Sequence, residues 1–86
     1  MSPAEAGTEI DSLRIEIDDL DDEILRLVRL RSEVSQRIGA ARLAAGGTKI
    51  VYNREMAVVR HYSQLGPEGR ELALLLLRLG RGQLGR

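Results

Sequence analysis

The sequence predicts an all-α protein with one long and two short helices per protomer, intertwined with those of a second copy in a homodimer. Apolar side chains recur at alternating steps of three and four residues from Ile10 to Ile38, the pattern of a long packing helix. The core must be aliphatic, because the chain has no Phe or Trp and only two Tyr. A chain of 86 residues buries little core alone, so we expect it to complete its interior by dimerising.

The long helix is expected to lie between a loose N-terminal tail and a glycine turn. Residues 1–8 mix proline, glycine and small polar side chains, so we expect a disordered tail there. The helical domain then occupies residues 9–79, and its first helix ends at Gly46-Gly47. About 34 residues at about 1.5 Å each make a rod about 50 Å long, which two short helices cannot cover.

Two shorter helices follow the glycine turn. Asn53 is the expected N-cap of the second helix, and Gly66-Pro67 ends it. Pro67 also suits the first turn of a third helix, which runs through Glu71–Leu79 and is apolar on all sides, so we expect it to be buried. Residues 80–86, GRGQLGR, contain three glycines and are predicted to form a flexible tail.

Composition and charge exclude several classes of protein. The 13 basic side chains are balanced by 13 acidic ones, and stacking residues are scarce, so we expect no nucleic-acid partner. The absence of cysteine excludes a disulfide scaffold and a thiolate metal site. The N-terminus does not resemble a secretory signal, and the longest apolar run, Leu72–Leu77, is too short to span a membrane. We therefore expect a cytoplasmic protein that binds no membrane.

Arg31 occupies a position where the helical pattern calls for an apolar side chain. A charge there needs a carboxylate partner or an anionic ligand, because burying an unpaired charge is costly. A structural ion pair, or a head group that reaches solvent, is the alternative explanation. Arg42 lies eleven residues later, within about 20° of the same helix face and about 16 Å further along the axis. Two arginines at that separation could both reach one small anion.

Three further residues extend this pair of arginines. Arg54 and Glu55 open the second helix and offer one cation and one acceptor for a hydroxyl, although an ordinary solvated helix start explains them equally. Arg14 lies about 25 Å before Arg31, so it could reach the same ligand only from an antiparallel copy of the long helix. The set suits a small hydroxylated polycarboxylate, bound without metal or cofactor.

The residues that form this set also carry a family resemblance. The run IDSLRIEIDDLDDEILRLVRLRSEVSQRIGAAR (10–42), followed by a loop and NRE (53–55), resembles the all-helical class of chorismate mutases, and the resemblance extends from Ile10 to Leu79. The Gly-Gly loop and the LGRGQLG tail are similar to a short actinobacterial subclass. Members of that subclass are weak catalysts alone and are activated by binding DAHP synthase, the first enzyme of the shikimate pathway.

The resemblance implies a reaction and a role for each cation. The reaction is the Claisen rearrangement of chorismate to prephenate, which fixed charges in a closed site can accelerate without a nucleophile or a cofactor. Arg31 would bind one substrate carboxylate, and Arg14 of the neighbouring protomer would do the same. Arg42 would face the ether oxygen, and Arg54 would add positive charge near a carboxylate.

The remaining implied contacts show where this chain departs from the family. Glu55, with the backbone around Val51, would hold the ring hydroxyl. Stronger members place a polar side chain on the connecting loop and a Gln or Glu on the third helix, whereas this chain has Val51 and LALLLLRL. The amide of Gln83 lies in the C-terminal tail. We therefore expect weak activity alone, and activation by a DAHP synthase partner that orders residues 80–86.

Two functions of other classes fit the same residues. A non-catalytic helical adaptor would use the long apolar face to pair with another protein. A regulatory sensor would bind chorismate or an aromatic amino acid without converting it. Loss of chorismate absorbance on adding the purified protein separates the enzyme from both.

Overall fold

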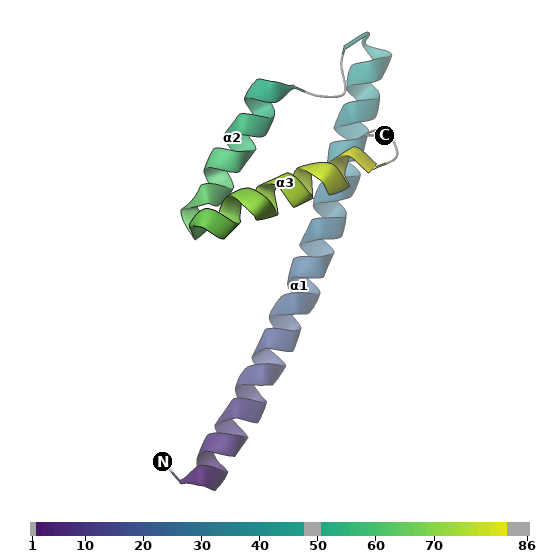
Figure 1. Ribbon diagram of the computed structural model, residues 1–86. Helices are drawn as coiled ribbons and strands as arrows, with labels where there is room; N and C mark the ends of the chain where they lie inside the picture. Colours follow the sequence, from purple (N-terminus) through teal and green to yellow (C-terminus); the bar gives the residue numbers. More distant parts are fainter. Residues whose placement is uncertain (1, 48–50, 83–86) are drawn as a thin grey trace.

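Three helices form the described part of the chain, and the first is far longer than the other two (Figure 1). The structure is a computed structural model that describes residues 2–47 and 51–82. The bounds of its elements are α1 Pro3–Ala44, α2 Tyr52–Tyr62, a 3-10 turn at Ser63–Leu65, and α3 Pro67–Arg81. The predicted all-α fold, with one long helix and two short ones, is confirmed.

Helix α1 begins earlier than the sequence predicted. The Ser2 hydroxyl accepts a hydrogen bond from the Glu5 N–H at 3.2 Å, and the Glu5 carboxylate accepts one from the Ser2 N–H at 3.4 Å. Pro3 occupies the first helical position, where its fixed φ favours the helix and its missing N–H is not needed. Residues 3–8 are therefore helical rather than a disordered tail, because this capping box stabilises the first turn.

Glycines end α1 and begin α3 where the sequence predicted. The Gly46 N–H donates to the carbonyl of Leu43, and the Gly47 N–H donates to that of Arg42, at 3.0 and 2.8 Å. Gly46 has a φ of 84° and Gly66 a φ of 94°, and residues with a Cβ rarely adopt such backbone conformations. Pro67 follows Gly66 as the first residue of α3. The two predicted breaks in the helical pattern are confirmed.

Helices α2 and α3 form a V, with the 3-10 turn at its closed end (Figure 1). Helix α3 is the arm of the V that packs against α1. In the ranges that the structure describes, α3 packs on both other helices, while α2 makes no close backbone approach to α1. The buried apolar side chains are Val58 of α2 and Ala73 and Leu76 of α3. These three residues all belong to the two helices of the V, which pack against each other.

The last turn of α3 crosses α1 at very short range. A Cβ built on Gly80 would lie 2.5 Å from the Ser35 Oγ and 2.9 Å from its Cβ, so only glycine fits at the crossing. Gly80 and Arg81 therefore belong to α3 and not to a flexible tail, because the crossing buries Gly80. The rest of the predicted tail, residues 83–86 with Gln83, lies outside the described residues.

The N-terminal half of α1 projects away from the rest of the protomer (Figure 1). Its predicted packing stripe is exposed, by 50 to 58% at Leu13, Ile17 and Leu20. The radius of gyration is 18.3 Å, whereas a compact chain of this length has one of about 12 Å. None of the described helices is both long and apolar enough to cross a membrane.

Candidate active site

A cleft of about 810 Å³, a volume suited to a small ligand, lies between the C-terminal half of α1 and the V formed by α2 and α3. All three helices contribute to its walls, and most of the lining is apolar. Five of the six predicted site residues line it together: Arg31, Arg42, Val51, Arg54 and Glu55. Ser35, Ile38 and Gly39, which lie between the two arginines of α1, also line it.

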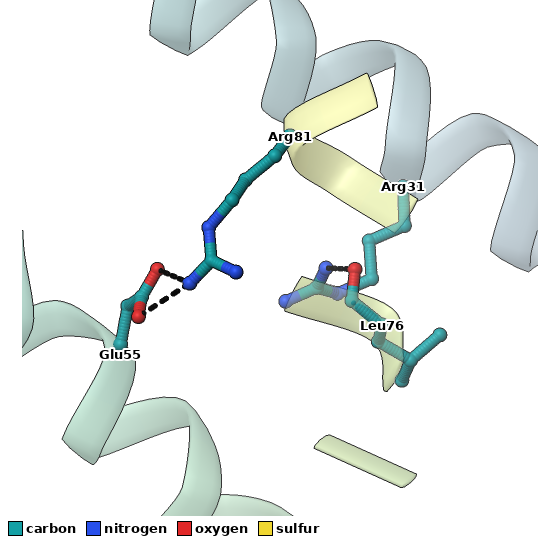
Figure 2. A network of polar contacts seen from close by, with 4 residues as sticks. All are labelled: Arg31, Glu55, Leu76 and Arg81. Atoms are coloured by element: carbon teal, nitrogen blue, oxygen red, sulfur yellow. Dashed lines mark hydrogen bonds and ion pairs between the residues drawn. The ribbon is translucent and has the colours of Figure 1, made fainter. Parts of the chain in front are cut away.

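Arg31 is half-buried and reaches across to α3 (Figure 2). Its Nη1 donates to the backbone carbonyl of Leu76 at 3.3 Å. No carboxylate of the described residues lies within ion-pair distance of it. The structural ion pair that was one explanation for Arg31 is thus not formed by this part of the chain. The remaining guanidinium N–H groups stay available for an anion in the cleft.

Arg42 is held at the far end of the cleft by the turn that ends α1. A Cβ built on Gly47 would lie 2.7 Å from Cγ and 3.5 Å from Cδ of the Arg42 side chain. The bare backbone of Gly47 therefore lies directly against the aliphatic stem of Arg42. Because this contact restricts the rotamers of the Arg42 side chain, the turn limits the directions in which its guanidinium can point.

Val51 and Arg54 lie where the chain enters α2. Val51 is the N-cap residue, and its carbonyl accepts the Glu55 N–H at 3.0 Å. Arg54 is exposed, and Glu55, one residue later, is half-buried. This first turn of α2 places backbone polar groups, a cation and a carboxylate on the side of the cleft opposite α1.

Glu55 already has a partner that the sequence analysis missed. The Arg81 Nη2 donates to both carboxylate oxygens, at 2.7 and 2.6 Å (Figure 2). The Arg81 side chain is 29% exposed and that of Glu55 is 22% exposed. The sequence predicts a flexible tail at Arg81, although this residue lies four positions after Leu77, another lining residue. That spacing puts both on one face of a helix, and extending the third helix by half a turn would have identified Arg81.

The cleft is electropositive. Four arginines, Arg31, Arg42, Arg54 and Arg81, and one carboxylate, Glu55, are its charged lining residues in the part of the chain that the structure describes. Their formal charges sum to +3. A small dianion with one hydroxyl group would satisfy two or more of the cations and donate to the carboxylate. The apolar remainder of the lining would exclude water from such a ligand.

Arg14 lies apart from this cleft, on the projecting half of α1, and is exposed. Arg31 comes seventeen positions after Arg14, which corresponds to about 25 Å of helix. One protomer therefore cannot bring both arginines to one small ligand. The contribution of Arg14 from a second copy stays a prediction.

Comparison with known proteins agrees with this arrangement. The profile of the family described as chorismate mutase type II matches residues 13–78. The intracellular chorismate mutase of Mycobacterium tuberculosis is 65% identical over 77 residues, covering 90% of this chain and 73% of that protein. That of Mycolicibacterium smegmatis is 57% identical over 82 residues, covering 94% and 79%.

A solved structure also matches the fold of this chain. It is a non-covalent complex of DAHP synthase and chorismate mutase from Corynebacterium glutamicum, with a bound transition-state analogue. It aligns with a TM-score of 0.87 and 46% sequence identity, covering 93% of this chain and 98% of that one. With the family profile spanning the three helices and relatives this similar, the chain belongs to the chorismate mutase type II family.

Proposed function

We propose that the chain catalyses the rearrangement of chorismate to prephenate in its cleft, without a cofactor, as part of phenylalanine and tyrosine biosynthesis. The observation that carries the proposal is the convergence of four arginines and one carboxylate, from three helices, on a single largely apolar cleft. The substrate is a dianion with one ring hydroxyl, and that charge pattern complements the lining. The ether C–O bond breaks as a C–C bond forms, so no other reactant is needed.

Each residue then has a distinct task. Arg31 binds a carboxylate, and Arg42 donates to the ether oxygen as negative charge develops there in the transition state. Arg54 adds positive charge near a carboxylate. Glu55 accepts the ring hydroxyl, beside the backbone around Val51. Holding the carboxylates and the hydroxyl together favours the compact, chair-like conformer, in which the reacting carbons approach each other.

The active form is a homodimer in which Arg14 of each protomer closes the cleft of the other. The exposed apolar stripe of α1 supports this proposal, because such a face is normally covered. The accessible surface supports it as well. The protomer exposes 6944 Å², whereas a compact monomer of this mass exposes about 5,000 Å².

The chain acts in the cytoplasm, in a complex with DAHP synthase that raises its activity. The support is the 46% identical Corynebacterium chain, which was solved in such a complex, and the relatives named as intracellular chorismate mutases. Val51 on the loop and the apolar middle of α3 leave few polar groups for the ether oxygen. The C-terminal segment that follows α3, with Gln83, is the part of the chain that we expect to contact the synthase.

The test is an absorbance assay for chorismate with the purified chain, alone and with the synthase of the same organism. We expect slow depletion of chorismate with formation of prephenate, and faster depletion with the synthase. Binding of chorismate without depletion under either condition would indicate a sensor. If the chain neither binds nor depletes chorismate, the result indicates an adaptor. A sensor or an adaptor result would each refute the proposed activity.

A further inference from the structure

The Glu55–Arg81 ion pair spans the open end of the V formed by α2 and α3. Glu55 lies in the first turn of α2 and Arg81 is the last residue of α3, so the two helix ends furthest from the 3-10 turn are tied together. Both side chains line the cleft, and Figure 2 shows them meeting in the space beside Arg31. The pair is thus part of the wall that a ligand would contact.

The geometry of the pair constrains the carboxylate and leaves it able to accept another bond. A single nitrogen, Nη2, serves both oxygens of Glu55, at 2.7 and 2.6 Å. Each carboxylate oxygen has a second lone-pair direction that this nitrogen does not use. A hydroxyl group in the cleft can therefore donate to Glu55 while Arg81 holds it.

Arg81 is fixed in this place by more than its charge. The residue before it, Gly80, is pressed against Ser35 of α1, and the next residue, Gly82, takes a φ of 52°. The backbone at Arg81 is thus anchored on α1 while its guanidinium reaches to α2.

We propose that Arg81 is a positioning residue. Its guanidinium holds the Glu55 carboxylate in the orientation in which it accepts the ring hydroxyl of the substrate. The inference rests on the proposed function, because it requires a hydroxylated substrate in the cleft. Arg81 acts through Glu55 and not by contact with the reacting atoms, so its effect depends on that carboxylate.

The first test compares single variants of the full-length protein in the chorismate assay. Without Arg81, the other arginines still bind the carboxylates, but fewer bound molecules adopt the reactive conformer. For Arg81→Ala we expect kcat to fall about tenfold while KM changes by less than about threefold. Arg81→Lys should recover most of the loss. Arg78→Ala, which removes an exposed cation from the same last turn of α3, should change neither parameter.

The second test asks whether Arg81 acts through Glu55. In a Glu55→Gln background, Arg81→Ala should have almost no further effect on kcat, since the carboxylate it orients is gone. Losses that multiply, with a raised KM, would make Arg81 a direct substrate ligand and overturn the proposal. A higher kcat/KM in Arg81→Ala would also overturn it, because the pair would then be inhibitory.

Thermal unfolding of every variant separates positioning from folding. A large loss of stability in Arg81→Ala that accounts for its lost activity, without rescue by Lys, would assign Arg81 a purely structural role. If the Ala variant does not fold, Arg81→Gln, whose side chain is closer in length to arginine, replaces it in the comparison of kcat and KM with the wild type. Wild-type activity in the same assay tests the proposed function separately, so the two ideas can fail independently.

Discussion

Arg42 illustrates how a single side chain depends on the turn beside it. Its stem lies against Gly47, whose N–H also bonds to the Arg42 carbonyl. The sequence predicted Arg42 from its place on the helix face, eleven residues after Arg31. It could not predict the Gly47 contact, because that contact depends on the path of the turn after α1. The same holds for Glu55, whose partner comes from a helix end 26 residues away.

Replacing Arg42 should remove most of the catalysis. We expect Arg42→Ala to lower kcat/KM by about 10²- to 10³-fold, since a donor to the developing charge is lost from a water-poor site. Arg37→Ala, which removes an exposed arginine of the same helix outside the cleft, is the matched control and should leave kcat/KM unchanged. The measurement is steady-state kinetics in the chorismate assay. Near-normal turnover of Arg42→Ala would contradict the assigned role.

Among the elements, the crossing of α3 over α1 controls the shape of the cleft. The sequence predicted the helices and the two glycine breaks, because apolar periodicity and Gly or Pro at helix ends are local signals. It missed the first turn of α1, because Pro3 and Gly7 are typical of a loose tail, whereas Ser2 and Glu5 in fact form a capping box there. It also missed the last turn of α3, because Gly80 is helical only through its contact with α1.

Substitution of Gly80 should therefore lower the stability of the protein, whereas substitution of another helical glycine should not. We expect Gly80→Ala to destabilise the protein by about 1–3 kcal/mol, because the new methyl collides with Ser35 and lies beside Arg31. Gly7→Ala is the matched control. Gly7 has no neighbour within 4 Å, so this change should stabilise α1 by up to about 1 kcal/mol. Chemical denaturation of both variants gives the comparison, and equal effects would argue against the tight crossing.

At the scale of the whole molecule, the exposed stripe of α1 should mediate dimerisation. Ile17 lies on the stripe and is 56% exposed in the protomer, while Ile15 is 62% exposed and lies about 200° around the helix. We expect Ile17→Asp to shift the protein to monomers or unfold it, and Ile15→Asp to leave the dimer intact. Analytical ultracentrifugation and circular dichroism report both outcomes. A dimer that tolerates both substitutions equally would refute this interface.

The shared site can be tested by mixing inactive protomers. Co-refolding Arg14→Ala with Arg31→Ala chains gives mixed dimers in which one cleft keeps both arginines, so about a quarter of the wild-type activity should return by random pairing. Mixing Arg31→Ala with Arg42→Ala is the control. Arg31 and Arg42 line the cleft of their own protomer, so each cleft of a mixed dimer lacks one of the two and activity stays low. If activity returns in neither mixture, Arg14 does not complete the cleft of the partner protomer.

The projecting half of α1 has a kinetic consequence. A helical segment that projects away from the rest of its own protomer gains little from folding until another chain lies along it, because isolated helices are marginal in water. Native structure should then form in a second-order encounter between partly ordered chains, at a rate that rises with protein concentration. Chains made at low abundance would remain unassembled and open to proteolysis, so the rate of synthesis would itself set how much of this protein reaches its working form.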